Sequence, residues 1–169
     1  MVFVFFMLLF SGFNPAQNSE EINAHIKATF IYNFTRYIEW PAESKKGNFV
    51  IGIFGTTPLF AELNKMKQKT TRGNQPFEIK TYSSVSVIGN CHIIFISKEK
   101  SGEIPEVVKM LKDKNTLIIS EKDGLIEKGA DINFVIFNNK QGFEINRTNI
   151  SDHGLSMASS LTSFATKVI

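Results

Sequence analysis

Apolar residues recur every three or four positions across residues 22–41, which is the period of one face of an α-helix. The stripe consists of Ile22, Ile26, Phe30, Phe34 and Tyr37, broadened by Ala24, Ala28, Ile31 and Ile38. Asn18, with Glu21 three positions later, resembles a capping box and predicts the start of the helix. Pro41 predicts its stop, because a proline ring disfavours helical geometry in the preceding residue. We therefore predict a long core helix that packs against a sheet.

Four short apolar or alternating runs follow this helix and predict β-strands, at residues 48–54, 77–82, 92–97 and 116–120. Thr57 and Pro58 predict the cap and the first residue of a helix after the first strand. Residues 104–111 carry apolar side chains at helical spacing between the last two strands. A strand, a helix and a strand joined by short links form a βαβ crossover, so these two strands are predicted to be parallel.

The C-terminal third predicts a hairpin and one more helix. Apolar runs at residues 132–137 and 142–146 flank the turn sequence 138–141, which is typical of antiparallel strands. Residues 155–169 carry apolar and small side chains at helical spacing. The predicted fold is a single three-layer α/β domain with a mostly parallel sheet, an antiparallel edge hairpin and helices on both faces.

Residues 1–10 are an apolar block that is much shorter than a membrane span, which needs roughly 20 residues. Small and polar residues follow, so we predict a signal peptide over residues 1–16 and the folded domain over residues 17–169. The block lacks lysine and arginine, and an uncleaved anchor is the alternative. No cysteine lies near the predicted cleavage region, which excludes lipid attachment there.

The composition narrows the class of protein. With 169 residues, 43% hydrophobic and 21% charged, the chain has the balance of one ordinary globular domain. A net charge of +3 without a dense basic cluster gives no reason to expect nucleic-acid binding. Cys91 is the single cysteine, so no internal disulfide can form. It precedes an apolar strand, which predicts a buried, inert thiol, although pairing between chains stays open.

Candidate catalytic and metal-binding residues are few. His25, His92 and His153 lack the spacing of metal ligands, so no metal site is predicted. Asp152, His153 and Ser156 are the residue types of a catalytic triad. They lie too close along the chain to form a hydrogen-bonded series, and no GxSxG elbow is present. A helix cap at Ser151 or Asp152 is the simpler interpretation.

The carboxylates also offer no convincing acid–base pair. Glu39, Glu121, Asp123 and Asp131 all lie beside predicted turns or helix ends, where solvated carboxylates are common. We therefore assign no catalytic residue and no cofactor, and we predict that the protein is not an enzyme. An exported hydrolase would need a cluster of ionisable groups that only the fold could assemble.

The stretch Gly55–Thr56–Thr57–Pro58 lies where a strand leads into a helix, a position that can bind phosphate. It lacks GxGxxG and the P-loop lysine, so a plain turn is the favoured interpretation. With Ser97, the first three residues would line a pocket at the carboxyl ends of the parallel strands. This predicts, as the alternative function, a small-ligand-binding module.

The chain resembles the YfiR-like family over nearly all of its predicted mature length. The resemblance rests first on residues 27–34 (KATFIYNF) and 36–41 (RYIEWP). It continues in residues 49–55 with Pro58 and Leu59, and then in residues 91–97, 116–120 and 129–134. Gly124, residues 143–146, Gly154, Leu155 and residues 159–161 complete it.

This resemblance implies a small periplasmic α/β regulator without catalytic activity. The best-studied kind binds the periplasmic sensor region of an inner-membrane diguanylate cyclase, so that cyclic-di-GMP output and biofilm formation fall. Other relatives stand beside or within sensor kinases, and the resemblance also implies a homodimer tuned by redox state and small ligands. Cys91 matches a cysteine position of the family but lacks a partner in this chain, so internal disulfide exchange is not expected here.

The end of the long helix is the predicted contact surface for such a partner. Arg36, Glu39 and Trp40 lie together there, and arginine and tryptophan are frequent anchors of interfaces. The alternative is that Arg36 is a solvated helix end and Trp40 a plug in the core.

Overall fold

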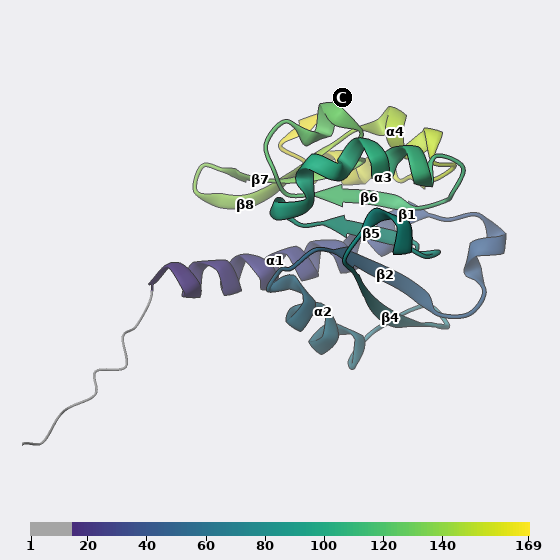
Figure 1. Cartoon of the computed structure of the whole chain (residues 1–169), viewed down its shortest axis with the longest axis horizontal. Helices are drawn as coiled ribbons and strands as arrows, with labels where there is room; N and C mark the ends of the chain where they lie inside the picture. Colours follow the sequence, from purple (N-terminus) through teal and green to yellow (C-terminus); the bar gives the residue numbers. More distant parts are fainter. Residues whose placement is uncertain (1–14) are drawn as a thin grey trace, which may run out of the picture.

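The structure, a computed structural model, describes residues 15–169, with side chains from residue 19 onward. Within this range the chain forms one three-layer α/β domain (Figure 1), which confirms the predicted fold class. The predicted signal peptide lies outside the described residues except for its last two positions, and it stays a prediction. In the described part, no helix combines the length and apolar character that a membrane span requires.

Across residues 15–169, a main sheet of eight strands has the order β10-β8-β7-β6-β5-β2-β4-β3. The strands are β2 (Phe49–Phe54), β3 (Thr71–Arg72), β4 (Gln75–Tyr82), β5 (Ile93–Ile96), β6 (Leu117–Ser120), β7 (Ile132–Phe137), β8 (Lys140–Ile145) and β10 (Lys167–Val168). The five strands from β4 to β7 in this order are parallel. Hairpin β7–β8 is antiparallel, and β10 adds a short parallel strand outside it.

The helices divide the core into two layers. They are α1 (Pro15–Tyr37), α2 (Leu59–Lys67), α3 (Ile104–Leu111) and α4 (Arg147–Asp152). Phe49, Ile51 and Ile53 of β2 belong to the core that includes α1 and α2, whereas Val50 and Phe54 belong to the core of α3. Because successive residues of a strand point to opposite faces, helices cover both faces of the sheet. The predicted β5–α3–β6 crossover is confirmed, since β5 and β6 are parallel.

The long helix differs from its prediction at its start and in the face it buries. Asn18 lies inside α1, not at its cap. Ile22 is 53% exposed, and the buried face instead runs through Ala24, Ala28, Ile31 and Phe34. The beginning of α1 projects beyond the central strands of the sheet (Figure 1). The predicted stop is nearly right, because α1 ends at Tyr37, just before Trp40 and Pro41.

The C-terminal segment does not form the predicted helix. After α4, residues 156–157 form β9 (Ser156–Met157), which pairs with β1 (Ile38–Glu39), and β10 later pairs with β8. Between them lies only a 3₁₀ helix, Ser159–Phe164. Hydrogen bonds to existing strand edges therefore override the helical spacing of the side chains. Asn146 caps α4, so the predicted cap at Ser151 or Asp152 is wrong.

One histidine fixes the amino ends of the strands. Nδ1 of His92 accepts a hydrogen bond from the Val50 N–H at 3.0 Å, and Nε2 donates to the carbonyl oxygen of Ser44 at 2.8 Å. The ring also stacks on Phe49. These partners assign the neutral ring with its proton on Nε2. Burial lowers the pKa of His92 below its ordinary value and outweighs the hydrogen bond to Ser44.

The α1–sheet contact predicts a large effect of Phe34→Ala. The ring of Phe34 is fully buried, lies edge-on to Phe143 at 5.0 Å and stacks near Phe134 at 6.1 Å. Removing it should lower the free energy of unfolding by about 3–5 kcal/mol, measured by urea denaturation. The control Ile22→Ala, on the exposed side of the same helix, should change it by less than about 0.5 kcal/mol. Equal effects of the two variants would contradict the assigned face of α1.

The neutral state of His92 predicts a loss of stability in acid. The unfolded chain binds a proton near the ordinary histidine pKa of about 6.5, whereas the folded chain resists protonation. The free energy of unfolding should therefore fall between pH 7.5 and pH 5.5 more steeply in the native protein than in His92→Asn. The difference in slope can reach about 1.4 kcal/mol per pH unit. Urea denaturation at several pH values measures it, and parallel pH profiles would exclude this role of His92.

Candidate functional site

One pocket lies at the carboxyl ends of the parallel strands. It has a volume of about 730 Å³ and is lined by the first half of α1, the turn after β2, the loops after β5 and β6, and hairpin β7–β8. Strands β4 and β5 lie on opposite sides of β2, so the chain order reverses at this edge. Such switch points are where open α/β sheets commonly bind ligands. We call this the carboxyl-edge pocket.

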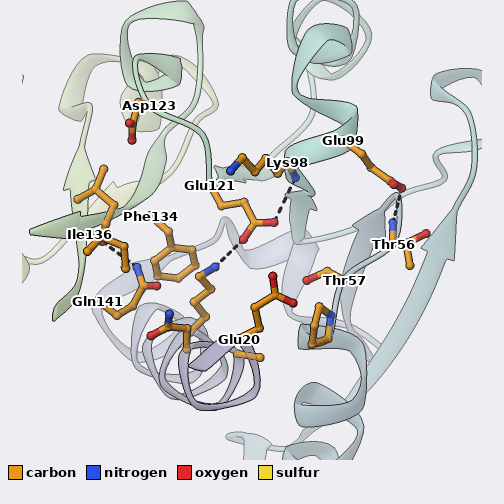
Figure 2. Close-up of a pocket in the computed structure, with 15 residues that line it drawn as sticks. Glu20, Thr56, Thr57, Lys98, Glu99, Glu121, Asp123, Phe134, Ile136 and Gln141 are labelled. Carbon is orange, nitrogen blue, oxygen red and sulfur yellow. Dashed lines mark hydrogen bonds and ion pairs between the residues drawn. The ribbon is translucent and has the colours of Figure 1, made fainter. Parts of the chain in front are cut away.

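An ion pair ties α1 to the floor of this pocket. The Nζ atom of Lys27 lies 2.5 Å from Oε2 of Glu121, and both side chains are largely buried. The other oxygen of Glu121 accepts a hydrogen bond from the Lys98 N–H at 3.1 Å. Figure 2 shows Glu121 between Lys98 and α1, with the ring of Phe134 beside them. The carboxylate of Glu121 thus joins α1, the end of β6 and the loop after β5. Its interpretation as a solvated carboxylate beside a turn is therefore wrong.

A protein carboxylate occupies the strand-to-helix turn. The Thr56 N–H donates to Oε1 of Glu99 at 2.7 Å, as Figure 2 shows. Helix α2 begins at Leu59 with Pro58 in the cap position, one residue later than predicted, and Oγ1 of Thr57 accepts a hydrogen bond from the Leu59 N–H at 3.3 Å. Four carboxylates and two lysines line the pocket: Glu20, Glu99, Glu121 and Asp123, with Lys27 and Lys98. This excess of negative charge disfavours a phosphate at the turn.

The four residues predicted for this pocket separate into two pairs. Thr56 and Thr57 line it. Gly55 lies behind it with φ of +94°, and a Cβ atom there would come within 2.2 Å of Oγ of Ser97. Ser97 is buried, and its hydroxyl has no hydrogen-bond partner in the described part of the chain. Gly55 and Ser97 therefore shape the turn from beneath, and a direct role in binding stays a prediction.

The residues predicted at the end of α1 also divide by exposure. Arg36 and Glu39 line a second pocket of about 350 Å³, which we call the helix-end pocket. Trp40 is only 2% exposed. Its indole N–H donates to the His92 carbonyl oxygen at 3.2 Å, and its ring lies edge-on to Phe49. Contact of Arg36 and Glu39 with a partner stays a prediction, and Trp40 could act only through its neighbours.

The helix-end pocket contains a residue that sequence reasoning did not single out. Arg72, on β3, donates from Nε to the Thr35 carbonyl oxygen at 3.0 Å and lies over the ring of Trp40. No local pattern links Arg72 to Trp40, because the two residues belong to opposite ends of the β2–α2 unit. A basic residue directly before the turn glycine Gly73 was the only signal in the sequence.

A second pair found only in the structure is Asp131 and His153. Nδ1 of His153 lies 3.0 Å from Oδ1 of Asp131, whose Oδ2 accepts from the Ile118 N–H at 2.6 Å. Asp131 is fully buried, so its predicted place as a solvated turn carboxylate is wrong. Burial raises the pKa of Asp131. Burial lowers the pKa of His153. The hydrogen bond and charge of Asp131, together with the charge of Asp152, raise it by more, so the net shift is upward. The pair fastens α4 to β6 and β7.

Cys91 is buried, as its place before an apolar strand predicts. Burial raises the pKa of the thiol to about 12, so the reactive thiolate is disfavoured. A disulfide between chains would require this side chain to reach the surface. Among residues 15–169, no group of three or more histidine, cysteine, aspartate or glutamate side chains is placed to hold a metal ion.

Comparison with solved structures shows a likeness in fold. The chain is similar to a protein described as the ABC domain in complex with L-Trp from Streptococcus pneumonia, with a TM-score of 0.59 and 13% identity. The alignment covers 87% of this chain but only 60% of that chain. At this identity the likeness concerns the fold alone. Among curated proteins, no significant match exists.

The family comparison identifies the family of the chain, whereas the structural comparison shows only its fold. The profile of the YfiR/HmsC-like family (DUF4154) matches residues 24–166, from the buried face of α1 to the segment before β10. This family is regulatory and is associated with control of a membrane diguanylate cyclase from the periplasm. The chain therefore belongs to the YfiR/HmsC-like family.

Proposed function

We propose that this protein is an exported regulator that binds a membrane signalling partner, a diguanylate cyclase or a sensor kinase, and represses or tunes its output. The observation that carries the proposal is the family match over residues 24–166. The apolar block at residues 1–10 supports export to the periplasm. The resemblance also implies a homodimer, which we keep as part of the proposal.

The helix-end pocket is the surface that we assign to the partner. Arg36 is exposed at the end of α1, and Glu39 follows it on β1. Trp40 lies beneath these residues and contacts Arg72, so it supports the surface without reaching it. Arg72 is held over Trp40 before binding, and a pre-positioned charge beside exposed charges suits specific contact with another protein.

We expect a photo-reactive amino acid at position 36 to cross-link the partner in intact cells. Mass spectrometry of the cross-linked product should identify a membrane diguanylate cyclase or sensor kinase. The same group at position 106, exposed on α3 at the opposite face of the sheet, is the control and should not capture that protein. Deletion of the gene should raise cyclic-di-GMP if the partner is a cyclase, and only an exported copy should restore the level. Equal capture from both positions, or capture of no signalling receptor, would refute the proposal.

The alternative function is a periplasmic module that binds a small ligand. The observation that favours it is the carboxyl-edge pocket, which lies at the switch point of the sheet and has the volume of a small-molecule site. Its lining mixes lysines and carboxylates with Phe134 and Ile136, so a ligand with both polar and apolar parts fits it best.

Thermal-shift screening with nucleotides and small metabolites tests this alternative. A true ligand should raise the melting temperature of the native protein, because binding to the folded state stabilises it. It should not stabilise Asn23→Trp, whose larger side chain would fill the pocket from α1. The control Glu21→Trp, on the exposed side of α1, should respond like the native protein. If no compound raises the melting temperature of the native protein, the ligand-binding alternative is refuted and the partner proposal is the one that remains.

A further inference from the structure

Arg72 is held as a nearly buried, rigid cation in the helix-end pocket. Its guanidinium carbon lies 5.1 Å from the ring centre of Trp40 and 5.3 Å from that of Phe49. Its Nε donates to the Thr35 carbonyl oxygen at 3.0 Å, and the side chain is only 13% exposed. Aromatic rings and a backbone carbonyl therefore fix the plane of the guanidinium before anything binds.

The outer edge of this guanidinium is poorly satisfied. Nη2 lies 3.5 Å from the Ile38 carbonyl oxygen and 3.4 Å from Oε2 of Glu39. Both distances exceed the ordinary range of such hydrogen bonds, which is about 2.7–3.2 Å. Among the described residues, Nη1 has no hydrogen-bond partner. A fixed planar fork with free donors suits a carboxylate, which can accept two parallel hydrogen bonds.

The charges around Arg72 also favour an anion. Three cations, Arg36, Lys45 and Arg72, and one carboxylate, Glu39, line the helix-end pocket of about 350 Å³. Glu39 is 57% exposed, lies 3.1 Å from Lys45 and reaches Arg72 only at the longer distance. An exposed pair of this kind contributes little free energy, so another carboxylate can displace Glu39 at low cost.

We propose that Arg72, with Arg36 beside it, is a docking site for an aspartate or glutamate side chain of the signalling partner, which replaces Glu39 on the guanidinium. This inference rests on the proposed function, because it assigns the partner an acidic contact segment. Glu39 then acts as a tethered competitor that weakens binding. Trp40 and Phe49 take part only by holding the guanidinium in place.

The test uses protein purified after export and an N-acetylated, C-amidated triglutamate peptide as the probe. The Nε–H signal of Arg72 in ¹⁵N NMR spectra should shift during the titration, because that group is fixed by Thr35 and sits beside the binding edge. Glu39→Gln removes the competitor and should tighten peptide binding by about two- to fivefold. The matched control Glu43→Gln makes the same change in charge at an exposed residue outside the pocket, and binding should stay as in the native protein.

Arg72→Lys keeps the charge but removes the planar fork, so binding should weaken about tenfold or more. The Glu39→Gln and Glu43→Gln pair carries the test if Arg72→Lys does not fold. No shift at Arg72, or equal tightening in both glutamine variants, would overturn the proposal. Equal shifts with acetate at the same carboxylate concentration would also overturn it, because the site would then be one for free small anions. These results do not depend on the cross-linking experiment, so the two proposals can fail separately.

Discussion

The packing of α1 against the sheet is the contact on which the rest of the structure depends. Ala24 and Ala28 let the helix approach closely, and Phe34 fills the space between the central strands and the hairpin with Phe134 and Phe143. This cluster turns a row of strands into a covered layer, since parallel strands are stable only when both faces are buried. It also fixes where the two ends of α1 lie relative to the two edges of the sheet.

Each candidate site uses one end of this helix. At the carboxyl edge, Lys27 forms an ion pair with Glu121 at the floor of the carboxyl-edge pocket. More carboxylates than lysines line this pocket. At the opposite edge, the chain after α1 places Trp40 on the amino ends of the strands and Glu39 beside Arg72. The domain therefore presents an acidic pocket at one edge and a basic pocket at the other. A shift of α1 along the sheet would change both sites together.

Local sequence patterns predicted most of the fold, but they could not predict contacts between residues that are far apart in the sequence. The apolar runs at β2, β5 and β6 identify buried strands because each signal lies within a few residues. The pair of Asp131 and His153 and the position of Arg72 depend on segments that only the folded chain brings together. The prediction of a helix after α4 was wrong for a related reason. The segment pairs with the free edges of β1 and β8, and these distant partners outweigh the helical spacing of its side chains.

The same distinction explains why the family was recognisable from the sequence whereas the role of Arg72 was not. Several residues that carry the resemblance are constrained by the fold: Phe34 and Trp40 are buried, and Gly55 needs a positive φ against Ser97. Such residues reflect the architecture, because packing and backbone geometry constrain them in this chain. Arg36 and Glu39, which we propose as partner contacts, are instead exposed, so packing in the core does not constrain them. The family match thus identifies the kind of protein, whereas the contact proposed at Arg72 rests on geometry that only the folded chain provides.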